Sequence, residues 1–448
     1  MPPGGIAGRL QRLPVFYGWV VVAVAFVTMS IGVNVRTAFS LLYPPLLTEF
    51  GWERGVTAAA FSLGFLAATM ITPVVGLMMD RVGPRLVIAA GALMCSTGLI
   101  SATVMTEPWH LYLSMGVLVV GGSTAMAYLV HSVFLPNWFA AQRALAIGIA
   151  FSGVGIGSIV LFPLLQMVID SYGWRAACWL LVAMLIFIVL PLNLALQRQK
   201  PADIGEHPDG VDPNKRDERT GRSHIIDNVV DKEWVAINWT LARAMRTREF
   251  WLVFVGFTAS LFAWYTILVH QTQYIIDQGY SVSTAALALG VVPLLGVGAQ
   301  IGFGYLSDQI GREWGHTIGC LGFVICYGAL LRMQADPHVG WLMVMIAAQG
   351  LLGYSMTPNF GAIPAELFQG PHFGAIYGVI NVGSTLGAAL GPWLIGWLHD
   401  LQGNYQSGFW IAGSATVFSC VCIWLAAPRK VRLVAGQARR RQRQLAVA

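Results

Sequence analysis

Long apolar runs separated by short polar turns dominate the chain from Phe16 almost to its C-terminus. These runs exceed the ~18 residues that distinguish a membrane-spanning helix from a helix buried in a soluble core. Twelve of them are predicted, at residues 16–47, 56–79, 86–106, 109–133, 145–169, 176–196, 250–274, 283–306, 314–333, 340–359, 374–398 and 406–426. The pattern therefore predicts an all-α membrane protein with twelve transmembrane helices, arranged as two six-helix, pseudo-symmetric bundles.

One long polar stretch separates the two groups of six runs. We expect an N-terminal bundle at 1–196, a cytoplasmic linker at 197–249, a C-terminal bundle at 250–426 and a basic cytoplasmic tail at 427–448. The linker has mixed charge with Pro, Gly and Asp, which is typical of a connecting segment and not of a catalytic domain. Overall, 56% of the 448 residues are apolar and only 11% are charged, which excludes a soluble protein of this size.

The distribution of Lys and Arg predicts the orientation. With the N-terminus in the cytoplasm, the outward loops contain only Arg54, Arg175 and Arg332 of the 27 basic residues. Basic residues concentrate on the cytoplasmic side of membrane proteins, so both termini are expected there. The first apolar run is too long for a cleavable signal peptide and lacks a small-residue cleavage site. We expect a multi-pass protein of a bacterial-type inner (plasma) membrane.

The net charge of +6 does not indicate a nucleic-acid partner, because the basic residues lie beside the membrane. The Arg-rich tail (Arg439, Arg440, Arg441, Arg443) is expected to face anionic lipids. The six cysteines lie in apolar segments without metal-ligand or redox spacing, so no metal and no cofactor is expected. The chain also has no nucleophile elbow, Walker loop or zinc motif, so it is not expected to be an enzyme, and transport would have to use a gradient or exchange.

An internal repeat relates the two halves at an offset of 228 to 230 residues. Gly76, Asp80 and Gly83 recur as Gly304, Asp308 and Gly311, and Gly148, Gly153, Gly157 and Asp170 recur as Gly378, Gly383, Gly387 and Asp400. Two halves repeated in parallel are typical of transporters that rock one half against the other around a central site. The Gly run at 152–157 indicates close helix packing and not a dinucleotide loop, because no strand precedes it.

The repeated Asp and Gly positions also define candidate gating residues. They lie in tight turns that would face the cytoplasm, where a charged latch could hold the halves together; the candidates are Asp80, Arg81, Arg85, Asp308 and Arg312. The alternative is a polar turn whose basic residues only follow the positive-inside rule.

The stretch GLMMDRVGPR, from Gly76 to Arg85, resembles the helix 2–3 loop motif of the major facilitator superfamily. The second copy departs from the motif, with Gln309 where the motif has Arg. Further stretches resemble the monocarboxylate and oxalate/formate transporter branch, among them Tyr17-Gly18-Trp19, Asn137-Trp138-Phe139, 143–148, Pro201–Gly205, Val269-His270, Phe373-Gly374 and Gly391-Pro392. The resemblance implies the twelve-helix fold of this superfamily and transport of a small organic anion.

Arg36 is the outstanding candidate for substrate binding, because a charged residue within a membrane span is costly unless it faces a cavity or a partner. Its planar guanidinium suits a carboxylate. The alternative is an interfacial Arg that extends outward to the headgroups. The resemblance implies a basic residue in helix 8 that binds the substrate carboxylate, but the only strongly polar residue of that helix here is Gln300. Helix 11 offers the uncharged Asn381.

Further candidates are polar residues that share helix faces. Tyr128 and His131 lie three apart in helix 4, as His270 and Gln273 do in helix 7, and Asn359 lies in helix 10. A histidine could carry a coupling proton, although a histidine hydrogen-bonded between helices would look the same in sequence.

We therefore predict a secondary active transporter that works by alternating access. Its substrate would be a small organic anion such as a monocarboxylate, moved by proton symport or anion exchange. The alternative is an efflux pump for amphipathic, drug-like compounds. The expected partners are the small-molecule substrate, a coupling proton and the lipid bilayer, and the protein is expected to be a monomer. A membrane-embedded enzyme or a sensor is disfavoured, because no catalytic cluster and no large soluble domain is visible.

Overall fold

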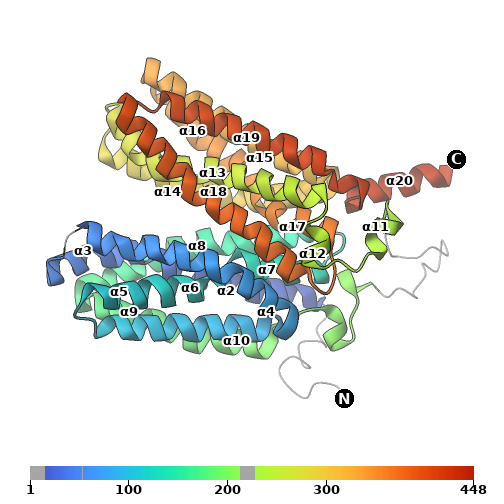
Figure 1. Cartoon of the computed structure of the whole chain (residues 1–448), viewed down its shortest axis with the longest axis horizontal. Coiled ribbons are helices and arrows are strands. Elements are labelled where there is room, and N and C mark those ends of the chain that lie inside the picture. The colour runs from blue at the N-terminus through green and yellow to red at the C-terminus, as the bar shows by residue number, and fades with distance from the viewer. Residues whose placement is uncertain (1–15, 53, 212–227, 448) are drawn as a thin grey trace. The chain divides into compact units, whose positions relative to one another are not determined.

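The computed structural model describes residues 16–52, 54–211 and 228–447. Nearly all of this described chain is helical (Figure 1). An isolated antiparallel bridge pairs Val229 with Arg432. The prediction of an all-α protein is confirmed.

Contacts between residues divide the chain into two compact units. The first consists of Met1–Ala140 and Ile149–Ile225, and the second of Ala141–Gly148 and Ile226–Ala448. The division passes through one helix, α8 (Arg143–Tyr172), whose first residues group with the second unit. The domain boundaries expected from the sequence stay predictions.

The first unit is built from long helices, several of them interrupted. Its elements are α2 (Tyr17–Thr37), α3 (Phe39–Phe50), α4 (Arg54–Thr103), α5 (Pro108–Leu111), the π-helical η1 (Tyr112–Val120), α6 (Gly121–Thr124), α7 (Tyr128–Trp138), most of α8, α9 (Trp174–Met184), η2 (Leu185–Val189), α10 (Leu190–Leu196), η3 (Pro201–Ile204) and η4 (Pro208–Gly210). The first predicted run, 16–47, is divided between α2 and α3 at Ala38.

The second unit contains the remaining helices and the start of α8. Its elements are α11 (Lys232–Ala236), α12 (Leu241–Ala244), α13 (Arg248–Asp277), α14 (Val282–Ile310), α15 (Arg312–Ala335), α16 (Val339–Ala347), η5 (Ala348–Leu352), η6 (Gly353–Met356), α17 (Thr357–Phe368), α18 (Phe373–Gln402), α19 (Gln406–Ala426), η7 (Pro428–Lys430) and α20 (Ala435–Val447). Its core includes the buried aromatic residues Tyr274, Phe323, Tyr327 and Phe409.

Eleven segments of the described chain are long and apolar enough to cross a membrane. One of them, Leu63–Thr103, lies within α4, which has 50 residues and would be ~75 Å long as a straight helix. That length is more than twice the ~30 Å of a hydrocarbon core. Gly83 interrupts α4 with a left-handed φ of 75°, which glycine adopts at little cost. The helix therefore comprises two spans joined at Gly83, which gives the twelve that the apolar pattern predicts.

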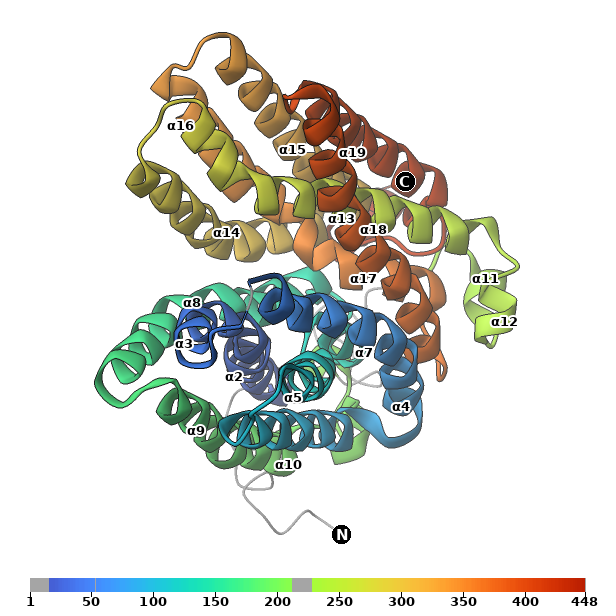
Figure 2. The same ribbon diagram turned by 60° about the vertical axis from the view of Figure 1, so that its left-hand side comes forward.

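Glycines let particular helix pairs approach closely in each unit. A Cβ at Gly153 or Gly157 of α8 would clash with backbone atoms of α2, and a Cβ at Gly387 of α18 would clash with the carbonyl of Thr258 in α13. The helices α13 and α18 run side by side (Figure 2). The close packing expected from the glycine runs is present in both halves.

Candidate functional site

Arg36 lies in the last turn of α2, where its side chain is only partly buried. Its guanidinium carbon is 5.7 Å from the centroid of the Phe65 ring, a cation–π contact. Arg36 also lines a small cavity in the first unit together with Phe39, Ala60, Met115, Val119 and Val120. The cavity has room for about one water molecule. The site thus offers a cation in an apolar setting, with too little space for an organic anion in this conformation.

Tyr128 and His131 are both on α7, and His131 is fully buried. Its Nδ1 lies 3.0 Å from the carbonyl of Ala127, which can only accept, so Nδ1 carries the proton of this hydrogen bond. Nε2 of His131 is buried and has no hydrogen-bond partner. Tyr128 packs edge-on against Phe151, at 4.8 Å between ring centroids. His131 is therefore a buried base whose second nitrogen is not satisfied by the protein.

His270 and Gln273 on α13 engage different partners, although they lie three residues apart. Nε2 of His270 is 2.9 Å from the carbonyl of Pro392 and therefore donates to it, and Nδ1 lies 3.5 Å from the Tyr405 hydroxyl. Gln273 is exposed and donates to Asp277 at 2.8 Å. His270 links α13 to α18, whereas the Gln273 bond stays within α13.

The three uncharged candidates of the second unit have different surroundings. Gln300 is buried and donates to the carbonyl of Gly296 within α14. Asn381 is half-buried on α18. Asn359 is fully buried and accepts a hydrogen bond from the Ser307 hydroxyl at 2.8 Å. Arg312 donates to the same hydroxyl, so Asn359 is joined to a residue predicted to act in gating.

The first of the two predicted gating turns surrounds the break in α4. Asp80 is half-buried there, and Arg81 and Arg85 are exposed. A Cβ on Gly83 would lie 3.1 Å from Oε1 of Gln199, whose amide donates to the carbonyl of Met79. The start of the expected linker therefore packs against this turn.

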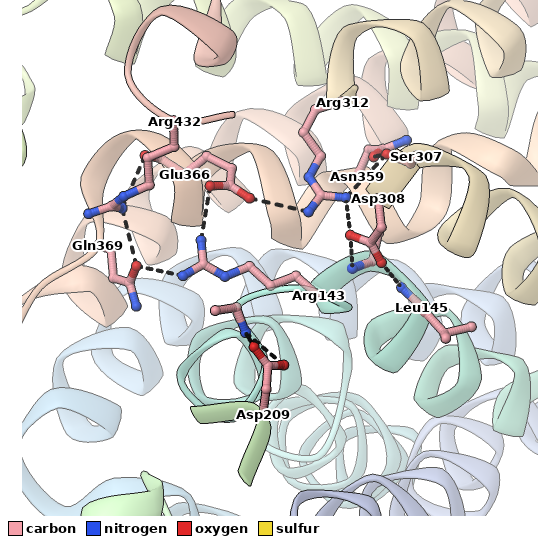
Figure 3. A network of polar contacts seen from close by, with 12 residues as sticks. Arg143, Leu145, Asp209, Ser307, Asp308, Arg312, Asn359, Glu366, Gln369 and Arg432 are labelled. Atoms are coloured by element: carbon pink, nitrogen blue, oxygen red, sulfur yellow. Dashed lines mark hydrogen bonds and ion pairs between the residues drawn. The ribbon is translucent and has the colours of Figure 1, made fainter. Parts of the chain in front are cut away.

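The second gating turn, between α14 and α15, is much more buried. Asp308 is fully buried and forms an ion pair of 2.6 Å with Arg312. It also accepts hydrogen bonds from the backbone N–H groups of Ala144 and Leu145, at 3.2 and 3.0 Å (Figure 3). These amides belong to the first turn of α8, where a helix has unpaired donors and a positive dipole end. Asp308 thus fixes the start of α8 to α14.

Glu366, near the end of α17, links two arginines. Its Oε1 lies 3.2 Å from Arg312 and its Oε2 lies 3.0 Å from Arg143. Arg143 also donates to Oε1 of Gln369 at 2.7 Å (Figure 3). We refer to Arg143, Asp308, Arg312, Glu366 and Gln369 as the ion-pair network. Its charged side chains are at most 5% exposed, and removing one member of a buried ion pair typically costs ~3–5 kcal/mol.

Three members of the network, Arg143, Glu366 and Gln369, are not among the site residues that the sequence predicts. The tenth apolar run was predicted to end at residue 359, but the span continues to Phe368 and includes Glu366. The signal that could have revealed it is a lone carboxylate among the apolar residues of 360–368. Arg143 lies in the stretch 143–148 that resembles the transporter branch, but no local pattern indicates its pairing with Glu366, which lies 223 positions away.

The candidate residues of the two units offer polar and charged side chains but no metal-binding group. Within the described ranges, no group of three or more His, Cys, Asp or Glu residues could hold a metal ion. The ion-pair network joins α8, α14, α15 and α17 through salt bridges and hydrogen bonds.

Comparisons with known proteins give consistent matches over most of the chain. The sequence model of the Major Facilitator Superfamily matches residues 19–338 and 299–447. The chain is 28% identical over 422 residues to monocarboxylate transporter 11 of Homo sapiens. The matched region covers 92% of this chain and 83% of that protein. The chain is 24% identical over 425 residues to monocarboxylate transporter 12 of Rattus norvegicus, covering 92% and 85% respectively. A solved structure of similar fold is the proton:xylose symporter XylE bound to 6-bromo-6-deoxy-D-glucose, with a TM-score of 0.71, 13% identity and coverage of 91% of this chain and 95% of that one.

Proposed function

This chain belongs to the major facilitator superfamily, and on that premise we propose that it carries a small organic anion, a monocarboxylate, by alternating access. It is a multi-pass membrane transporter and not an enzyme. We also propose its substrate, its coupling ion, its gating residues and its topology.

The observation that carries the proposal is the position of Arg36. A guanidinium in a membrane span is costly, and here it borders an internal cavity beside the Phe65 ring. Its planar fork suits a carboxylate, and the apolar side chains around it would strengthen that attraction by excluding water. Because the cavity has room for only about one water molecule, lining side chains such as Phe39 or Met115 have to move before an anion can bind. The names of the relatives, monocarboxylate transporters 11 and 12, support a carboxylate substrate.

The coupling proton of a symport mechanism is assigned to His270. His131 is fully buried, and a proton added to its Nε2 would find no acceptor in the protein. His270 is only half-buried, and the Tyr405 hydroxyl beside its Nδ1 can either donate or accept. The remaining candidates, Tyr128, Gln273, Gln300 and Asn381, are proposed as polar residues along the path.

The ion-pair network is assigned a gating role, since it attaches the first turns of α8 to α14 and α17. Asp308 and Arg312 belong to it directly, and Asn359 is joined to it through Ser307. Asp80, Arg81 and Arg85 are proposed to act at the equivalent turn of the first half. We place the monomeric protein in a plasma membrane of the bacterial inner-membrane type, with both termini in the cytoplasm.

Uptake of radiolabelled lactate or formate into proteoliposomes tests the anion site. Arg36→Ala should lower uptake about 100-fold, because a charge-assisted contact contributes ~1.5–3 kcal/mol and ~1.4 kcal/mol corresponds to a factor of ten. Arg36→Lys should retain part of the activity. Arg332→Gln, which removes an exposed charge, is the matched control and should leave uptake unchanged.

The same vesicles test coupling and the alternative substrate class. Uptake by His270→Phe should no longer respond to an imposed pH gradient, whereas His131→Phe should still respond. Full uptake by Arg36→Ala would refute the anchor role of Arg36. Extrusion of an amphipathic dye by a protein that takes up neither acid would favour the efflux alternative.

A further inference from the structure

The chain turns back across the end of the second unit after α19. Ala427 ends α19 in a left-handed conformation, with a φ of 47°, which costs a residue with a Cβ roughly 1–2 kcal/mol. The backbone then pairs with the end of the linker: Val230 N–H donates to the carbonyl of Val431, and Leu433 N–H donates to that of Asn228. We call residues 428–438 the C-terminal strap. Backbone pairing and a tolerated strained residue indicate a docked segment.

The strap is attached to the turn between α14 and α15. The backbone N–H and the side chain of Arg429 both donate to Oε1 of the buried Glu313, at 3.0 and 3.3 Å. Gln437 donates to the carbonyl of Ile310 at 2.7 Å. Gly436 lies so close to Gln309 that a Cβ there would clash with its backbone. This turn joins Asp308 to Arg312, so the strap contacts residues that are adjacent in the chain to two members of the ion-pair network.

A second attachment joins the strap to the end of α17. Arg432 donates to the backbone carbonyl of Glu366 at 3.3 Å and to Oε1 of Gln369 at 3.1 Å (Figure 3). The same Gln369 oxygen accepts the hydrogen bond from Arg143. Arg432 therefore restrains both the backbone that carries the Glu366 carboxylate and the amide that orients Arg143.

From these contacts we propose that Arg432 is a positioning residue for the ion-pair network, and that the C-terminal strap holds the first turns of α8 against α14 and α17. Among the described residues of the second unit, the strap has no hydrogen bond or ion pair to His270. It acts on the network from outside, through Gln369 and through the turn at Gln309 and Ile310. The inference rests on the gating role proposed for that network.

The charges around Arg432 are not balanced. Three arginines (Arg143, Arg312, Arg432) face two carboxylates (Asp308, Glu366), so the cluster has one positive charge in excess. Burial and the nearby charge of Arg143 lower the pKa of Arg432 to about 10, so it is still protonated at neutral pH. Arg143 and Arg432 repel each other across a neutral oxygen, and the strap therefore contributes less to stability than its number of contacts suggests.

Hydrogen–deuterium exchange of the full-length protein in lipid nanodiscs tests this role without a substrate. The informative peptide covers residues 140–149, whose Ala144 and Leu145 amides are bonded to Asp308. The variants are Arg432→Gln and Gly436→Leu, with Glu366→Gln as a reference that breaks the network directly. Arg440→Gln removes an exposed charge from α20 and is the control. Arg429→Gln is a milder strap variant that retains the backbone bond to Glu313, should the others fail to fold.

If the strap positions the network, Arg432→Gln and Gly436→Leu raise exchange in 140–149 on the order of ten-fold, Arg432→Lys restores part of the protection, and Arg440→Gln has no effect. If exchange rises only in 228–231 and 428–438, the strap is a local structural element and the proposal is wrong. If exchange in 140–149 rises with Glu366→Gln but not with the strap variants, the gating role of the network stands and the positioning role of the strap is refuted. No rise with Glu366→Gln refutes the gating role as well.

Discussion

The helix pairs α2–α8 and α13–α18 occupy equivalent places in the internal repeat, and glycines bring both pairs together. In the first pair, the Ser30 hydroxyl donates to the carbonyl of Gly153 and the Asn34 amide donates to that of Val154, at 2.8 and 2.9 Å. The corresponding positions of the second pair are Thr258 and Phe262. Thr258 bonds only to a carbonyl of its own helix, and the cross-helix link lies further along, from His270 to Pro392.

Two kinds of contact hold each helix pair together, and only one kind is shared by the two pairs. Close approach depends on the absence of a side chain at the repeated glycines, which both halves keep. The polar links are specific to each half, and in membranes such hydrogen bonds contribute only ~0.6–2 kcal/mol each. The link of the second pair uses the imidazole of His270, whereas that of the first pair uses the amide of Asn34. The close-packed geometry is thus shared, while the chemistry of the polar link differs between the two pairs.

The largest expected effect comes from adding a methyl group at the glycine contacts. Gly157→Ala and Gly387→Ala should each lower the free energy of unfolding by about 2 kcal/mol, because the new Cβ meets backbone atoms that cannot move aside. Thermal unfolding of the purified protein measures the loss. Gly298→Ala on α14 is the control, since its Cβ would point into open space, and it should be neutral or slightly stabilising. Equal stability of Gly387→Ala and Gly298→Ala would contradict the shared geometry.

A smaller effect is expected from replacing the polar Asn34 of the first pair with an apolar residue, since the corresponding position of the second pair is Phe262. Asn34→Leu removes the bonds to Val154 and Ser30 and should cost about 1 kcal/mol in the same assay. Thr258→Val is the matched change in the second pair and should cost less than about 0.5 kcal/mol, because its hydroxyl bonds only within α13. If the two variants lose the same stability, the polar links do not distinguish the pairs.

Features that depend on residues close together in the sequence could be predicted, and features that depend on residues far apart could not. Apolar runs are local, so the spans were predictable, including the two within α4 that Gly83 separates. The glycine repeat also predicted close packing on α8 and α18. The contacts that define the site are not local, since Arg143 and Glu366 lie 223 residues apart and no periodicity indicates their pairing. Arg36 could be placed within a span, but its contact with Phe65 depends on how α2 packs against α4.

The smallest shift in melting temperature is expected at the start of α2, which begins differently from α13. Thr247 caps α13 locally and accepts a hydrogen bond from Phe250 N–H at 3.3 Å, so Thr247→Ala should cost about 1 kcal/mol at every pH. The start of α2 has no cap from its own N-cap residue; the backbone N–H of Tyr17 donates to Glu206, which follows the helix η3.

Burial raises the pKa of Glu206 above its ordinary value, and the bond from Tyr17 offsets only part of this rise. The folded protein therefore binds more protons than the unfolded chain just above the ordinary carboxyl pKa, and stability falls as the pH rises through that window. Glu206→Gln keeps an acceptor for Tyr17 without the charge. Its melting temperature should match the wild type near pH 4 and exceed it slightly, by about 1–2 °C, at pH 7. A variant that is less stable than the wild type at pH 7 would show that the charge of Glu206 helps the dipole of α2 more than its burial costs.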